Sequence, residues 1–129
     1  MMFTNIDDAI NWIIEQRNDE STFEHFKLVC NKLNNPQNDF YTIHVAGTDG
    51  KGSTVAYLRD ELMSQGFKVG TLQSPHYITH LDRIRVNNSN IPADVFLKIL
   101  NDNYDFFISN DMSMFEMDYL IMCEYFKRE

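Results

Sequence analysis

Residues 46–54 read AGTDGKGST, a glycine-rich stretch between two segments of different pattern. Before it, residues 40–46 (FYTIHVA) are rich in β-branched and aromatic side chains, which predicts a mostly buried strand. Four apolar residues after the stretch share one helical face: Val55, Leu58, Leu62 and Met63. Gly66 is expected to end that helix, and residues 68–72 (KVGTL) read as a second strand. The order predicts a right-handed βαβ unit with a parallel strand pair.

A glycine-rich turn between a strand and a helix is suited to binding an anion, because backbone N–H groups and the helix N-terminus face the ligand. Lys51 adds a positive charge, and Ser53 and Thr54 add hydroxyl groups. The usual phosphate loop has glycine where Val45 stands and Ser or Thr where Gly52 stands. The alternative is an ordinary turn with a solvated lysine, but its placement between strand and helix favours a nucleotide site.

Residues 44–54 (HVAGTDGKGST) resemble the segment HVAGTNGKGST of the folylpolyglutamate synthases and the bifunctional dihydrofolate synthases. These enzymes are part of the Mur ligase superfamily of ATP-dependent, amide-forming enzymes. In that superfamily the loop is shorter than the usual phosphate loop, and glycine after the lysine is typical of the folate branch. The resemblance therefore accounts for both departures and implies a nucleotide site.

Three further segments resemble the same family in the same order. Residues 35–37 (NPQ) are similar to the turn before its first strand. Residues 74–76 (SPH) with 82–84 (DRI) are similar to its SPH…ERI segment, and residues 113–116 (SMFE) to its TxFE segment. The resemblance extends from about Asn5 onward.

The fold that the resemblance implies is α/β, with the parallel sheet of a phosphate-loop NTPase-like Mur ligase central domain, incomplete in this chain. Residues 1–129 would form the N-terminal part of the ATP-binding domain, and the C-terminal glutamate-binding domain would be absent. By the same resemblance ATP and Mg²⁺ are the expected cofactors.

Residue roles are also implied by the resemblance. Lys51 would bind the β- and γ-phosphates of ATP and serve as the catalytic cation. The nucleotide would contact Gly47, Thr48, Asp49, Gly50, Lys51, Gly52, Ser53 and Thr54. Ser74 and Glu116 would bind Mg²⁺. The folate-type substrate would contact Pro75, His76, Asp82 and Arg83.

Several of these residues have simpler interpretations. Ser74 also reads as a turn hydroxyl before proline, and Arg83 as a solvated strand arginine. Glu116 stands three residues after Ser113, which is the spacing of a helix capping box. Asp49 stands where the family commonly has Asn, so it would either repel the phosphates, point away, or face a metal ion. Asp82 replaces the common Glu and shortens its reach by one methylene.

The implied reaction is the ATP-dependent addition of L-glutamate to folate or dihydropteroate through an acyl phosphate. The chain alone is expected to be inactive, because the later parts of the family's enzymes are missing. The alternative is a non-catalytic nucleotide- or partner-binding module derived from such a ligase. An unrelated phosphate-loop kinase is a weaker alternative, disfavoured by the residues 74–84 and 113–116.

Composition limits the other function classes. The chain has 129 residues, enough for one modest domain, and its net charge of −8 disfavours a nucleic-acid or anionic-membrane surface. No apolar run approaches the roughly 20 residues that span a bilayer. Its two cysteines, Cys30 and Cys123, lie far apart and predict reduced thiols. We expect a soluble, cytoplasmic protein.

Helical patterns cover residues 5–16, 23–33 and 113–127, and a further helix is expected to start at Pro92. Residues 21–24 (STFE) match a capping box before the second of these. Residues 83–86 alternate like a strand, and 87–90 read as a turn. The last helix is apolar on most faces and the two parallel strands leave an open edge, so we expect self-association.

Overall fold

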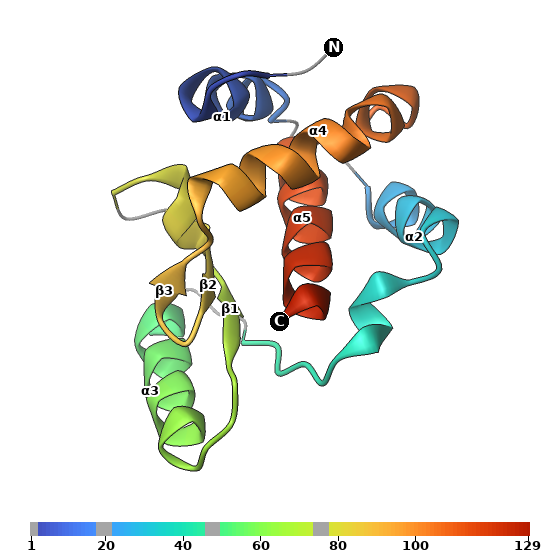
Figure 1. Cartoon of the computed structure of the whole chain (residues 1–129). Coiled ribbons are helices and arrows are strands. Elements are labelled where there is room, and N and C mark those ends of the chain that lie inside the picture. Colours follow the sequence, from blue (N-terminus) through green and yellow to red (C-terminus); the bar gives the residue numbers. More distant parts are fainter. Residues whose placement is uncertain (1–2, 18–21, 46–49, 74–77) are drawn as a thin grey trace. The chain divides into compact units, whose positions relative to one another are not determined.

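The computed structural model describes residues 3–17, 22–45, 50–73 and 78–129 (Figure 1). The chain divides into two compact units. The first unit combines Met1–Phe40 with Pro92–Glu129, and the second is Tyr41–Ile91. None of the helices in the described ranges is long and apolar enough to cross a membrane.

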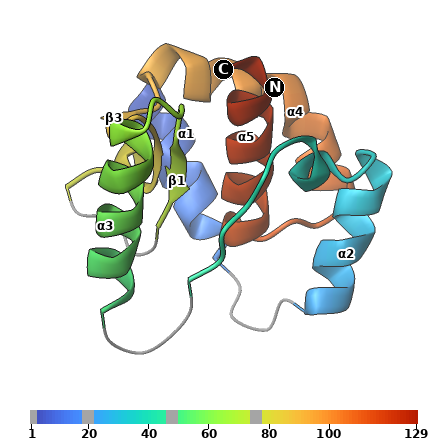
Figure 2. The ribbon, with the colours of Figure 1, turned by 90° about the horizontal axis from the view of Figure 1, so that it is seen from below.

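The first unit is helical. Its elements are α1 (Ile6–Glu15), α2 (Phe23–Lys32), the 3₁₀ turn η1 (Pro36–Asp39), α4 (Ala93–Ser109) and α5 (Met114–Arg128). In both ribbon views α1 and α2 lie on either side of α5 (Figures 1 and 2), which also packs against α4 and η1. Helix α5 is therefore the centre of this unit.

Local capping explains where these helices begin. The Asn5 side chain accepts a hydrogen bond from the Asp8 amide at 2.9 Å, and Thr22 Oγ1 accepts one from the His25 amide at 3.1 Å. The expected helices are confirmed. The capping box expected at residues 21–24 is wrong in its detail, because the N-cap is Thr22, while Ser21 lies outside the described residues.

The buried face of α5 finds its cover inside this unit. Its buried apolar side chains are Met117, Leu120, Ile121, Met122, Cys123 and Tyr125. Helix α4 contributes Phe96, Ile99, Leu100 and Phe107 to the same core. The prediction that the last helix leaves its apolar faces uncovered is therefore wrong, because α1, α4 and η1 pack against it.

Both cysteines are buried free thiols of the first unit. Burial raises the pKa of the Cys30 thiol, and burial together with the nearby Cys30 raises the pKa of Cys123 to about 12. The thiols therefore stay protonated and poorly reactive at neutral pH.

The second unit contains α3 (Lys51–Ser64), β1 (Gly70–Leu72), the 3₁₀ turn η2 (His80–Arg83), β2 (Ile84–Val86) and β3 (Ser89–Asn90). The three strands pair antiparallel in the order β1-β2-β3. Asn87 and Asn88 both have positive φ, 49° and 65°, as a two-residue hairpin turn of the primed type requires. Residues 89–90, expected within a turn, thus form the returning strand.

The expected parallel pair is not found in the described part of the chain. Residues 41–45 form no strand, although their side chains favour one. Tyr41 and Ile43, which the pattern predicted to be mostly buried, are exposed. Strand β1 instead pairs with β2, and Leu72 lies opposite Ile84. An apolar extended pattern becomes a strand only when another backbone satisfies its N–H and C=O groups, and residues 70–72 find that partner in the nearby β2.

Helix α3 ends as the sequence predicts. Gly66 has a φ of +90°, and the amides of Gly66 and Phe67 donate to the carbonyls of Met63 and Leu62, which is a Schellman motif. Arg59 of α3 donates to the Asn88 side chain at 2.9 Å and so ties the helix to the hairpin turn. None of the residues of α3 is buried.

Candidate functional site

The described part of the glycine-rich stretch opens helix α3. Gly50 is the N-cap with a φ of +76°, a conformation that favours glycine, and its carbonyl accepts from the Thr54 amide at 2.9 Å. Lys51 is the first helical residue, and residues 50–54 are exposed. Gly50 has no side chain to cap the first-turn amides, and no acidic residue stands in that turn. The local geometry suits an anion at the helix N-terminus.

Six predicted site residues lie outside the described residues: Gly47, Thr48, Asp49, Ser74, Pro75 and His76. Of the predicted nucleotide-binding residues, the structure therefore describes Gly50 to Thr54 in the second unit. The predicted metal ligand Glu116 is in the first unit.

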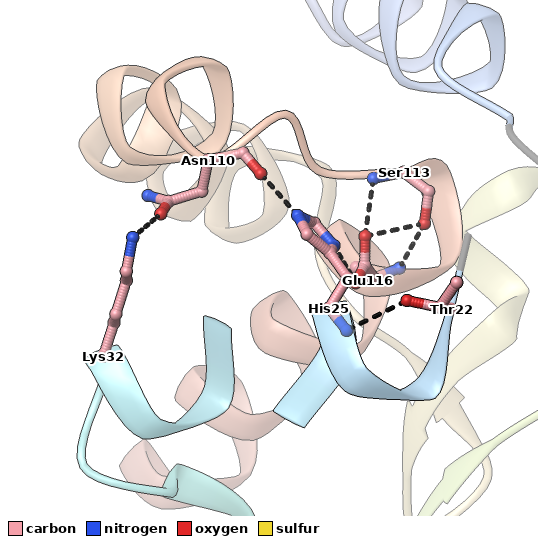
Figure 3. A network of polar contacts seen from close by, with 6 residues as sticks. All are labelled: Thr22, His25, Lys32, Asn110, Ser113 and Glu116. Atoms are coloured by element: carbon pink, nitrogen blue, oxygen red, sulfur yellow. Dashed lines mark hydrogen bonds and ion pairs between the residues drawn. The ribbon is translucent and has the colours of Figure 1, made fainter. Parts of the chain in front are cut away.

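Glu116 is buried, with 2% of its surface exposed, at the start of α5. Its Oε1 accepts from the Ser113 amide at 3.0 Å and from the Ser113 hydroxyl at 3.1 Å. The Ser113 hydroxyl in turn accepts from the Glu116 amide (Figure 3). The capping box that the sequence offered as the simpler interpretation of Glu116 is thus present.

The other carboxylate oxygen of Glu116 contacts His25 of α2. His25 Nδ1 lies 2.7 Å from Glu116 Oε2, and Nε2 lies 2.8 Å from the backbone carbonyl of Asn110 (Figure 3). Both ring nitrogens face acceptors, an arrangement that favours the doubly protonated ring. The hydrogen bond to Glu116 is the main cause that raises the pKa of His25 above its ordinary 6.5, and burial acts against it.

Asn110 connects this network to Lys32 and to the end of α4. Its carbonyl faces His25, its Oδ1 accepts from the Lys32 ammonium, and its Nδ2 donates to the Phe106 carbonyl at 2.9 Å. Three segments of the first unit therefore meet here: α2, the end of α4 and the start of α5 (Figure 3). We name these residues the His25–Glu116 network: Thr22, His25, Lys32, Asn110, Ser113 and Glu116.

As it stands, this arrangement does not fit a divalent cation on Glu116. Both carboxylate oxygens are bound by donors of the chain itself, and His25 already supplies a compensating charge. Within the described ranges, no group of three or more His, Cys, Asp or Glu side chains is placed to hold a metal ion. Magnesium binds exposed, hard oxygens alongside several waters, which a carboxylate that is 2% exposed does not offer.

The predicted substrate-binding residues Asp82 and Arg83 are buried in the second unit. Asp82 Oδ2 accepts from the amides of Ile78 and Thr79 at 2.8 and 3.0 Å, and so caps η2. The carboxylate stabilises this turn from within and is only 1% exposed. Arg83, with 8% exposed, is not the solvated strand arginine of the alternative interpretation.

Sequence reasoning missed His25, Lys32 and Asn110. Neither helical periodicity nor capping patterns connect His25 to Glu116, which is 91 residues away. For Asp82 a signal exists, because Thr79 and Asp82 have the Thr-x-x-Asp spacing of a cap.

No protein-family model matches the chain. It is 37% identical over 102 residues to a dihydrofolate synthase/folylpolyglutamate synthase of Bacillus subtilis, a match over 78% of this chain and 24% of that protein. The chain thus spans about a quarter of that relative's length.

Comparison with solved structures points to the same group of proteins. The folylpolyglutamate synthase of Thermotoga maritima superposes with a TM-score of 0.87 and 28% identity, over 95% of this chain and 30% of that one. The Escherichia coli protein in complex with ADP gives 0.84 and 25%, over 97% and 30%. A bifunctional Yersinia pestis enzyme with AMPPNP and Mn shares the fold, with a TM-score of 0.83 and 22% identity over 97% and 31%. In sequence and in fold, this chain therefore belongs to the folylpolyglutamate and dihydrofolate synthases, of which it matches a segment.

Proposed function

We propose that this chain supplies the phosphate-binding loop of an ATP-dependent ligase that joins L-glutamate to folate or dihydropteroate. One observation carries the proposal: Gly50, in the left-handed conformation, opens helix α3 with Lys51 at its first position. Related structures in complex with ADP and with AMPPNP support nucleotide binding by a chain of this fold. The remaining parts of the proposed site, Gly47 to Asp49 and Ser74 to His76, stay predictions.

The chemistry follows from this placement. In the proposed reaction the γ-phosphoryl group of ATP passes to a substrate carboxylate, which gives an acyl phosphate and ADP. The amine of glutamate then attacks the acyl carbon, and phosphate leaves. Lys51 and the first-turn amides of α3 would neutralise charge on the phosphates and hold them in line. For the whole enzyme we also propose a parallel sheet, an Mg²⁺ role for Ser74 and a substrate role for Asp82 and Arg83. The Mg²⁺ role of Glu116 does not fit the structure described, because both of its carboxylate oxygens are already hydrogen-bonded.

The test is nucleotide binding to the chain. We expect Lys51→Ala to weaken ATP binding by about 1.5–3 kcal/mol, the contribution of one charged hydrogen bond. Calorimetry with ATP in the absence of divalent cations measures this, with Lys98→Ala as the control, because Lys98 is an exposed lysine of the other unit. Equal heats from the wild type and Lys51→Ala would exclude the loop as the site.

A second candidate is a nucleotide- or partner-binding module without ligase activity of its own. The observation that favours it is the match to only 24–31% of the related chains. Incubation with ATP, glutamate and dihydropteroate distinguishes the two, since only the ligase releases ADP and a glutamylated product. A cytoplasmic location also remains part of the proposal.

We also propose that the chain self-associates, through the second unit rather than through α5. Helix α3 buries none of its residues, and five large apolar side chains of this unit are exposed: Tyr41, Ile43, Tyr57, Phe67 and Ile78. We expect light scattering to give a mass above the 15.2 kDa of one chain that rises with concentration. A constant mass of one chain would contradict it.

A further inference from the structure

Two arginine side chains of the second unit meet at one amide oxygen. Arg59 of α3 and Arg85 of β2 each donate a hydrogen bond from Nη1 to Asn88 Oδ1, at 2.9 and 3.3 Å. Both distances end on the same atom, so the two Nη1 nitrogens can be no further apart than their total, about 6.2 Å. An uncharged acceptor therefore holds two cationic groups close together.

The hairpin turn fixes this arrangement beside α3 (Figure 1). Asn87 Oδ1 accepts from the Val69 amide at 2.8 Å, and the Asn87 amide donates to the Val69 carbonyl at 2.7 Å. On the other side of the turn, Arg85 Nε donates to Asn90 Oδ1 at 2.9 Å. The position of the Asn88 side chain is therefore set by the backbone of a turn that is held on both sides.

The hydrogen bonds satisfy the guanidinium N–H groups but do not neutralise their charge. Asp60 pairs with Arg59 Nε at 2.9 Å and compensates part of it, although its side chain is 67% exposed and water screens the pair. Like charges at this separation repel. An oxyanion in contact with both guanidinium groups would replace this repulsion by attraction.

We propose that the Arg59–Arg85 cluster, which consists of Arg59, Arg85, Asn88 and Asn90, binds a phosphate group. Guanidinium donors occupy the Oδ1 atoms of both asparagines, so the polar groups that these side chains offer a ligand are their Nδ2 donors. A set of donors without acceptors suits a deprotonated oxyanion. Donors from four side chains suit a tetrahedral phosphate better than a planar carboxylate, which has only two oxygens.

This site is separate from the proposed nucleotide site and goes beyond the proposed function. Arg59 stands eight residues after Lys51 in α3, which is about 12 Å along the helix axis. Asn88 and Asn90 are exposed, and 16% of the Arg59 side chain is exposed, so the cluster is open to a ligand from solvent.

The experiment is calorimetry with inorganic phosphate at constant ionic strength. Lys51→Ala serves as the parent chain, so that the glycine-rich loop does not contribute. Arg59→Gln and Arg85→Gln should each weaken phosphate binding about tenfold, because one charged contact is lost. The matched control is Arg128→Gln, which removes an exposed arginine of the other unit and should leave the affinity unchanged.

Asn88→Asp separates phosphate binding from a purely structural role of the cluster. Aspartate keeps the Oδ1 acceptor and tolerates the positive φ of 65°, but its own charge takes the place of the anion. We expect this variant to lose phosphate binding while the amides of β2 exchange as slowly as in the parent chain. If Asn88 only tied the hairpin to α3, Asn88→Asp would leave the phosphate affinity unchanged, and that result would overturn the proposal.

Two further ligands identify what the cluster recognises. Ribose 5-phosphate carries the group as a monoester: binding as tight as that of inorganic phosphate assigns the site to phosphate groups in general, and weaker binding assigns it to the free ion. Both results support the proposal. Succinate bound as tightly as phosphate would overturn the assignment to a phosphate group.

Absence of saturable phosphate binding, or equal affinities in the parent chain and the two arginine variants, would also overturn the proposal. Neither result affects the ATP binding through Lys51 that tests the proposed function. If the variants do not fold, nitrogen NMR of the parent chain decides. Phosphate should shift the Nε resonances of Arg59 and Arg85 and leave that of Arg128 in place, and resonances that do not move at saturation contradict the inference.

Discussion

Phe96→Ala is expected to lower the free energy of unfolding of the first unit by about 3–5 kcal/mol, the usual cost of removing a fully buried phenylalanine side chain. Phe96 has 0% of its surface exposed, in the core formed by α4 and α5. Removing the ring loses its burial and leaves a cavity among side chains that pack closely.

Urea unfolding followed by tryptophan fluorescence measures this, since the single tryptophan, Trp12, packs against Phe3 and Tyr104 in the same unit. The control is Phe23→Ala, which removes the same ring from a position that is 70% exposed. It should change the free energy of unfolding by only about 0.5 kcal/mol or less. Equal losses from the two variants would mean that α4 does not pack as described.

Asp82→Ala is expected to destabilise the second unit by about 1–3 kcal/mol, because two partly buried amides lose their charged acceptor. These are the amides of Ile78 and Thr79, which donate to Asp82 Oδ2. If Asp82 acted on a substrate alone, the same change would leave the stability of the free chain unaltered.

Hydrogen exchange of the amides in β2 (Ile84–Val86) measures the stability of this unit separately from the first. Asp82→Asn, which keeps one acceptor oxygen, should recover part of the loss. Asp60→Ala is the matched control, because this carboxylate is exposed and pairs with Arg59 at the surface, a contact that contributes about 0–1 kcal/mol. A loss for Asp82→Ala no larger than that of Asp60→Ala would contradict the structural role.

Much of the local structure could be predicted because its causes lie within a few residues. Asn5 caps α1, the Ser113–Glu116 box caps α5, and Gly66 ends α3. Each of these features depends on a side chain and an amide three or four positions apart, or on the backbone freedom of a single glycine.

The site could be predicted only in part. The residues that open α3 stand where the sequence placed them, and of the two interpretations of Glu116 the capping box is confirmed. No sequence pattern connects His25 to Glu116, because the contact joins the first turn of α2 to the first turn of α5. The same holds for Asn110, whose carbonyl completes the network.

The sequence by itself therefore determined the helices, their ends and the glycine-rich opening of α3, because these depend on short-range hydrogen bonds and side-chain periodicity. Only the tertiary structure decided that β1 pairs antiparallel with β2, that α5 is covered within its own unit, and that Asp82 and Glu116 are buried. The physical reason is that strand pairing, burial and charge compensation depend on which distant segment packs against a residue. A pattern read along the chain does not contain that information.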